Sequence, residues 1–242
     1  MSDFKIGKVY DGAKKLRPLW LRCLVYVMGM LILAIGISLT TKLNLGVSPI
    51  ISIAFATSEI FTINFATMAF VLYATFVLIQ VVIHLVLKKY RLVVFDLSQM
   101  IINFIMTIFL AATGTLVGDL AQGALNGLFT NIFGRYLILF VSIILTGVGA
   151  AMSLNMRIVP NPGDGIVQIL SDVSGKPLGL VKNIFDISCV IITVIGSWIL
   201  VGDFIGLGPG TLFAMIGVGR VISIYQKLTE NSWLLKAEVK PS

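Results

Sequence analysis

The chain has 242 residues, of which 57% are hydrophobic and only 12% are charged, and its formal net charge is +7. Its mean hydropathy is +1.01. Soluble domains carry about 25% charged residues, so this composition excludes an ordinary soluble domain and predicts an integral membrane protein. Because each span needs about 20 apolar residues, the length suits one membrane domain of about six to eight helices.

The N-terminal part of the chain alternates polar and apolar segments. Residues 1–18 are polar and basic, and we expect them to form a cytoplasmic tail. The first span, at about 19–40, is too long for the apolar part of a signal peptide, and no small-residue cleavage site follows it. After the break Gly46-Val47-Ser48-Pro49 comes a short segment, 48–60. Its 13 residues would cover about 20 Å as a helix, less than the roughly 30 Å hydrocarbon core.

The rest of the chain follows the same scheme. Five further spans are expected, at about 65–87, 92–116, 136–154, 178–201 and 207–225. The segment between the two halves mixes apolar and polar residues and predicts an interfacial helix. A second short segment, 163–173, follows the break Pro160-Asn161-Pro162-Gly163. The predicted division is a basic tail, a first membrane repeat, a connector, a second membrane repeat and a cytoplasmic tail, at 1–18, 19–117, 118–134, 135–225 and 226–242.

The two membrane segments repeat with an offset of 114 in residue number, which places Pro49 over Gly163 and Ser48 over Pro162. Basic residues gather in cytoplasmic loops, and the basic turn 88–91 joins both tails on that side only if both short segments turn back. We therefore predict an all-α, polytopic helical membrane protein with two inverted repeats, each with three spans and one short re-entrant or broken helix. If both short segments cross instead, the chain has eight spans.

Charged residues near the breaks are the candidates for a site. Asp164 opens the second short segment, where it could cap the helix or serve as an intramembrane charge in a binding site. Asp186 follows Lys182 by four residues on one helix face, which fits either a structural pair or a carboxylate that faces a cavity. Arg157 could contact Asp164 or an anionic ligand. The candidate solute- or ion-binding residues are Ser48, Pro49, Arg157, Asn161, Gly163, Asp164, Lys182 and Asp186.

Other polar residues fit structural roles. His84, near the end of a span, is expected to be an interface residue, and Asp96 an acid favoured by the dipole of a helix start. Cys23 and Cys189 lie in apolar runs and are expected to be small core side chains. The sequence contains no nucleophile–base pair, metal cluster or cofactor motif, so we expect neither an enzyme nor a cofactor. Nothing in it predicts a nucleic-acid partner.

The breaks also carry a resemblance. With the sequence Gly46-Val47-Ser48-Pro49 after the first span and Gly206-Leu207-Gly208-Pro209-Gly210-Thr211 before the last, the chain resembles the YczE/YyaS/YitT-type family of bacterial membrane proteins over residues 20–225. The resemblance implies a bacterial cytoplasmic-membrane protein and supplies no catalytic residues.

Paired interrupted segments in matching halves point to a transporter binding site. The sequence therefore predicts a secondary transporter of a small polar solute, anionic or zwitterionic, coupled to an ion. The alternatives are an aquaporin-like channel, which also uses two short helices, and a non-transporting scaffold or accessory subunit. The expected partners are the lipid bilayer, a small-molecule solute and a coupling ion. The sequence leaves open whether the chain forms a homo-oligomer.

Overall fold

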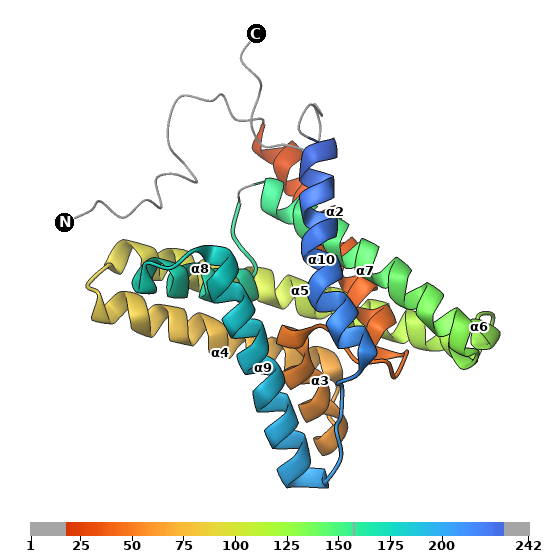
Figure 1. Ribbon diagram of the computed structural model, residues 1–242. Coiled ribbons are helices and arrows are strands. Elements are labelled where there is room, and N and C mark those ends of the chain that lie inside the picture. Colours follow the sequence, from red (N-terminus) through yellow and green to blue (C-terminus); the bar gives the residue numbers. More distant parts are fainter. Residues whose placement is uncertain (1–17, 157, 230–242) are drawn as a thin grey trace.

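The computed structural model describes residues 18–156 and 158–229, and this part of the chain is helical, without strands. Helices stand at every predicted span and at both short segments (Figure 1). They are α2 (Leu19–Thr41), α3 (Pro49–Phe61), α4 (Phe65–Val86), α5 (Tyr90–Gln122), α6 (Asn126–Thr130), α7 (Ile132–Asn155), α8 (Pro162–Ser174), α9 (Leu178–Val201) and α10 (Pro209–Leu228). The all-α fold class is confirmed.

Five of the described helices are long and apolar enough to cross a membrane: α2, α4, α5, α7 and α9. The chain is therefore a polytopic helical membrane protein. The sixth predicted span corresponds to α10, whose 20 residues are not among these five helices. Helix α5 is longer than expected, with 33 residues. It takes up the start of the predicted connector 118–134, of which only α6 remains as a separate short helix between α5 and α7.

The second half of the fold repeats the element order of the first. The residue numbers at which α7, α8 and α9 begin exceed those of α2, α3 and α4 by 113 in each case, and we call this difference the repeat offset. The offset of 114 predicted from the sequence was therefore wrong by one. The true offset superposes Pro49 and Pro162, each at the first position of its helix, where the fixed φ of proline fits and its missing N–H costs nothing.

Helices α2 and α7 pack side by side in opposite directions, and two arginines hold their ends together. Arg22, in the first turn of α2, donates Nε and Nη2 to the Met156 carbonyl oxygen just after α7, at 2.9 and 2.6 Å. Arg135, in the first turn of α7, donates Nε to the Leu43 carbonyl oxygen just after α2, at 2.6 Å, and Nη2 to the same oxygen. The two donors are separated by the repeat offset, and so are the two acceptors, which makes the contacts reciprocal.

The middle of the same helix pair shows the same reciprocity. A Cβ at Gly36 would lie 2.4 Å from Thr146 Oγ1, and a Cβ at Gly149 would lie 2.4 Å from the Leu33 backbone nitrogen. The repeat offset relates the two glycines to each other and also relates their two neighbours. Small residues at these two points let the backbones approach closely, which is how helices associate in lipid.

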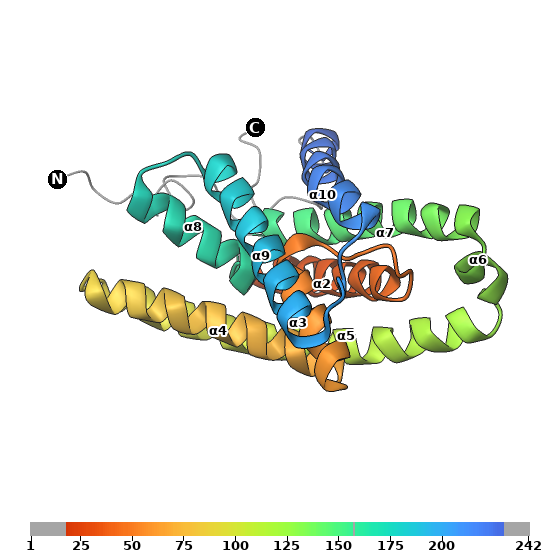
Figure 2. The ribbon, with the colours of Figure 1, turned by 60° about the horizontal axis from the view of Figure 1, so that its bottom comes forward.

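Helices α5 and α10 pack on α2 and α7, respectively, in similar registers. Helix α5 runs parallel to α2, since Ser38 Oγ lies 2.8 Å from Thr113 Oγ1 and the Lys42 side chain approaches Gly118. Helix α10 runs parallel to α7, since Gly217 packs on Ile143 and Gly147 on Val221. The register of α10 on α7 therefore matches that of α5 on α2 to within two positions. In Figure 2, α2 lies between α5 and α7, which α6 joins at one end.

These directions sort the loops into two ends of the molecule. The start of α2, the turn 87–89, the end of α7 and the end of α10 share one end. The chain leaves that end after α7 and comes back to it along α8, since Asp172 near the C-terminus of α8 lies within electrostatic range of Lys89 and His84. Helix α3 leaves from the opposite end, after α2, and returns there to begin α4. In each half, the chain therefore enters and leaves its short helix at the same end of the molecule.

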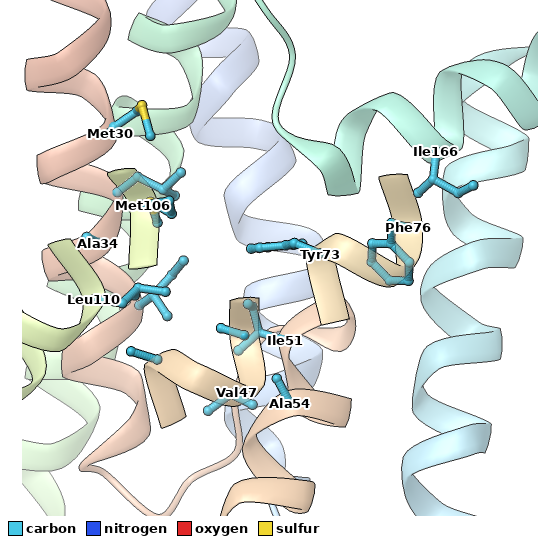
Figure 3. Close-up of a cluster of buried hydrophobic side chains, with 14 of the residues drawn as sticks. Met30, Ala34, Val47, Ile51, Ala54, Tyr73, Phe76, Met106, Leu110 and Ile166 are labelled. Carbon is cyan, nitrogen blue, oxygen red and sulfur yellow. The ribbon is translucent and has the colours of Figure 1, made fainter. Parts of the chain in front are cut away.

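The main hydrophobic core joins the first half to the short helices. Buried side chains from α2, α3, α4, α5 and α8 meet in one cluster (Figure 3). The residues labelled there are Met30, Ala34, Val47, Ile51, Ala54, Tyr73, Phe76, Met106, Leu110 and Ile166. Both short helices thus bury one face in protein, as segments that do not span a bilayer must.

Candidate functional site

The two short helices meet at their N-termini. Ser48 and Asn161 occupy the N-cap positions of α3 and α8, and a Cβ at Gly163 would lie 3.6 Å from Ile50 Cγ2. Gly163 and Ile50 are related by the repeat offset, so equivalent positions of the two halves touch here. The free N–H groups at a helix start favour negative charge. The meeting point therefore brings two such starts together.

This meeting point lies at mid-depth of the spanning helices. Tyr26 of α2, Tyr73 of α4 and Asn103 of α5 surround it, and each stands within its helix rather than at an end. Tyr73 also interacts through its phenol with the side chain of Asn161. If the helices cross a bilayer, polar groups gather here at the depth where they are most costly to leave unpaired.

Asp164 lines a small cavity at this point. The cavity is bounded by α2, α4, α5, the end of α7 and the segment that leads into α8, and its free volume of about 30 Å³ suffices for one or two water molecules. Among the described residues no hydrogen bond to the Asp164 carboxylate is formed. Asn103 also lines the cavity, and its Oδ1 is buried without a partner in this part of the chain. The cavity is thus lined by two acceptor groups for which the described residues supply no hydrogen-bond donor.

Asp164 is not the N-cap that the sequence allowed. Asn161 has that role, since its Oδ1 accepts a hydrogen bond from the Gly163 N–H at 3.2 Å. Asp164 stands in the first turn of α8, where the helix dipole favours an acid. Its side chain is therefore not needed for capping and is available to the cavity.

The predicted pair on α9 forms and lies near Asp164. Lys182 Nζ donates to both carboxylate oxygens of Asp186, each at 3.2 Å. The Asp186 side chain is 6% exposed and that of Lys182 is 44% exposed. Both lie within electrostatic range of Asp164. Two acids and one lysine from α8 and α9 therefore form one charged group beside the meeting point.

Two glutamines hold the start of α8. Gln99 Nε2 donates to Gln80 Oε1 at 2.9 Å, and Gln80 Nε2 donates to the Pro162 carbonyl oxygen at 3.2 Å. Both side chains are buried, and they press on Gly165, where a Cβ would lie 2.7 Å from Gln80 Oε1. The side-chain amide of Gln80 on α4 thus holds the backbone in place at Pro162, the first residue of α8.

The structure brings most of the predicted site residues together. Asn161, Gly163, Asp164, Lys182 and Asp186 lie around the meeting point. Ser48 and Pro49 begin α3 beside it; Ser48 caps the helix without a side-chain hydrogen bond, and Pro49 is buried. Arg157 lies outside the described residues.

Sequence reasoning missed the polar residues contributed by the first half. These are Tyr26, Tyr73, Gln80, Gln99 and Asn103. One pattern could have revealed part of the set: Asp96, Gln99 and Asn103 recur at helical spacing in an apolar span, which marks one polar face. The prediction for His84 was wrong, because His84 is buried and paired with Asp96 rather than placed at an interface.

Metal ligands are not clustered in the described part of the chain, where no three His, Cys, Asp or Glu side chains could hold an ion together. Cys189 is buried and Cys23 is exposed, and within the described residues both are free thiols. The expected core position is therefore wrong for Cys23, which lies on the outer side of α2. What the site offers is carboxylate, phenol and amide groups with two helix starts, a set suited to binding.

Comparison with known families agrees with the extent of the fold. A family model described as a family of unknown function (DUF6198) matches residues 20–227. The chain belongs to this family. The match covers every helix from α2 to α10 except the first and last residues, and so includes both short helices and the point where they meet. No curated protein and no solved structure matches the chain.

Proposed function

We propose that this DUF6198 protein is a secondary transporter of a small polar solute, which binds where α3 and α8 meet. One observation carries the proposal: two short helices, each begun by a proline, meet N-terminus to N-terminus at mid-depth beside an acid that lines a cavity. Discontinuous helices with their starts at the bilayer midplane are how many secondary transporters build their substrate sites.

The repeat supports the same function. The constant repeat offset, the antiparallel packing of α2 on α7 and the reciprocal arginine contacts all favour two halves of inverted topology. Inverted repeats allow each half to adopt the conformation of the other, which exposes a central site alternately to the two sides. The charged group of Asp164, Lys182 and Asp186 lies beside that centre and is suited to coupling.

The lining favours a zwitterion over a plain anion. Among the described residues that line the cavity, Asp164 is the one charged side chain, and the others nearest to it are phenols and amides. A solute ammonium group would pair with the Asp164 carboxylate and face the phenol rings. A solute carboxylate would accept from the free N–H groups at the start of α3 or α8.

The distribution of basic residues supports a cytoplasmic orientation for both ends of the described chain. Lys88, Lys89 and Arg91 lie at the end where α2 starts and α10 stops, whereas Lys42 and Arg135 lie toward the other. Cytoplasmic loops carry the excess of lysine and arginine. We also propose that this membrane is the bacterial cytoplasmic membrane, as the resemblance to the YczE/YyaS/YitT-type family implies.

A water channel is the second candidate, because two short helices that meet at their starts, one with Asn161-Pro162, also build aquaporin-type pores. Water conduction does not require the charged group on α8 and α9, so a plain water pore does not account for it. An acid at this depth would also add an electrostatic barrier or a binding site to such a pore.

Uptake into proteoliposomes tests the proposal. Zwitterionic, anionic and cationic radiolabelled metabolites would be offered with and without ion gradients, and osmotic water flux would be measured in the same vesicles. We expect gradient-driven uptake of a zwitterion by the parent protein. Asp164→Asn should lower it about ten- to a hundredfold, since a hydrogen bond to a charged group is worth about 1.5–3 kcal/mol.

Asp119→Asn provides the matched control, because Asp119 is exposed on α5, away from the meeting point. It should transport at the parent rate. Fast water flux without solute uptake would replace the transporter by the channel. If the amount of folded Asp164→Asn protein falls as much as its uptake does, the variant has no separate transport defect. Asp164 would then have a structural role.

A further inference from the structure

Besides the Lys182–Asp186 pair, a second polar pair lies closer to the turn that joins α4 to α5. His84 Nδ1 lies 2.5 Å from Asp96 Oδ2, and both side chains are almost fully buried, with 4% and 2% exposed. His84 Nε2, the other ring nitrogen, is also buried and has no hydrogen-bond partner among the described residues. An acceptor nitrogen with an acid fixed behind the opposite ring nitrogen is the arrangement of a general base.

This pair ends a line of polar side chains whose acidic and basic members occur in only one half of the fold. Along α4 and α5, the line leads from the turn 87–89 to the meeting point. Its members are His84, Asp96, Gln80, Gln99 and Asn103. The residues that the repeat offset assigns to these positions in the second half are Ser197, Pro209, Thr193, Leu212 and Ile216. The acidic and basic members are confined to the half that faces α8.

The surroundings of the pair favour the binding of a proton. Asp96 of α5 faces one ring nitrogen; Asp172 of α8 lies within electrostatic range of His84, and Lys89 of the turn lies near Asp172. With a neutral imidazole, the buried pair carries one uncompensated negative charge. A proton on Nε2 turns it into a neutral ion pair, and a buried pair costs less than a buried single charge.

We propose that His84 and Asp96 form a proton-binding site, loaded from the turn between α4 and α5, which makes the proton the coupling ion of transport. The proton adds to His84 Nε2 while Nδ1–H continues to donate to Asp96, and no other bond changes. The coupling role rests on the proposed transport function, whereas proton binding itself does not.

The link from this pair to the solute site is mechanical. Gln80 stands one turn before His84 on α4, and Gln99 one turn after Asp96 on α5. Their amides do not carry protons in a relay, but they tie α4 and α5 to the Pro162 carbonyl at the start of α8. A change in the charge of the His84–Asp96 pair, and hence in its spacing, is therefore transmitted to the helix start beside Asp164.

Proton binding can be read directly, because His84 is the only histidine in the chain. Protein labelled with ¹⁵N-histidine and purified through a tag without histidine would be titrated by NMR in nanodiscs. Above neutral pH we expect hydrogen on Nδ1 alone, and on acidification hydrogen on both nitrogens. A neutral ring with hydrogen on Nε2, or nitrogen signals that do not change between about pH 5 and 9, would overturn the proposal without reference to transport.

Coupling is then tested with a solute that the proteoliposomes accumulate. His84→Gln and Asp96→Asn should both abolish accumulation driven by a pH gradient, yet retain exchange of labelled for unlabelled solute. Asp119→Asn on the same helix as Asp96 should retain both. If His84→Gln still accumulates solute against its gradient when protons flow inward, the proton site does not couple. Absence of any solute uptake by the parent protein contradicts the transport function instead, and the NMR result stands by itself.

Discussion

At the scale of single residues, Gly165 and Gly163 differ in the space around them although they are two positions apart on α8. A Cβ at Gly165 would lie 2.7 and 2.9 Å from the Oε1 atoms of Gln80 and Gln99, closer than real contacts allow. A Cβ at Gly163 would lie 3.4 Å from the Tyr73 ring, which is ordinary contact. The Gln80–Gln99 pair therefore requires a glycine at position 165 but not at position 163.

We expect Gly165→Ala to destabilise the protein by about 2–4 kcal/mol, since it overpacks the site and separates buried hydrogen-bond partners. Gly163→Ala, the matched control, should stay within about 1 kcal/mol of the parent. Thermal unfolding in detergent, followed by tryptophan fluorescence, measures both. Equal stabilities of the two variants would contradict the role assigned to the glutamine pair.

Single residues also show what the sequence could not supply. The sequence marks Asp164 as a charge in a break, but it does not decide between Asp164 and Asn161 as the cap, because both residue types can cap a helix. The structure has Asn161 at the cap, since α8 begins at Pro162, one residue earlier than the sequence predicts. Tyr26, Tyr73 and Asn103 come from three distant helices, and only packing decides which faces of those helices meet. The site on α8 could be located from the sequence, whereas its opposite wall could not.

At the scale of helices, the contacts at the ends of α2 and α7 could not be predicted from sequence periodicity. Each helix leaves carbonyl groups unpaired at its C-terminus, and lipid offers them no water. Arg22 and Arg135 supply the missing donors across the pair, each with two N–H groups on one oxygen. A basic residue at the start of a span resembles a simple membrane anchor in the sequence, so its distant partner could not be predicted.

We expect Arg135→Gln to lower the free energy of unfolding by about 2 kcal/mol, because the amide is too short to reach the Leu43 carbonyl and leaves it unpaired. Arg220→Gln on α10 is the control, since Arg220 is exposed. Chemical unfolding in mixed micelles would compare the two. A loss in Arg220→Gln as large as in Arg135→Gln would show that charge alone, and not the contact, matters.

At the scale of the whole molecule, apolar length was the dependable guide. Spans were predicted well because a membrane crossing imposes about 20 apolar residues. The two short helices were found because proline fixes where they start. The repeat offset was wrong by one, since glycine and proline both mark breaks and the alignment exchanged them. The length of α5 was underestimated, because Asp119 and Gln122 interrupt the hydropathy but not the helix.

The two ends of the molecule give a topology prediction. Arg91 lies beside the turn between α4 and α5, and Asp203 lies between α9 and α10 at the opposite end; both are exposed. In a background without the native cysteines, an impermeant maleimide should label Asp203→Cys in intact cells. It should label Arg91→Cys only after the membrane is opened. Labelling of both from outside would contradict the turning back of α8.

Two cavities occupy matching places in the two halves of the fold. Thr40, Thr41, Gly46 and Val47 line one of about 200 Å³, which also reaches Glu59 on α3. Their counterparts at the repeat offset, which are Ser153, Leu154, Val159 and Pro160, line the cavity of about 30 Å³. If each half took the backbone shape of the other, the larger cavity would form where the smaller one now lies, between the end of α7 and the start of α8. The contact of Ile50 with Gly163 would stay in place, because the repeat offset relates these two residues to each other. A second conformation of the protein, open on the opposite side, can therefore be built from the first by exchanging the shapes of its halves.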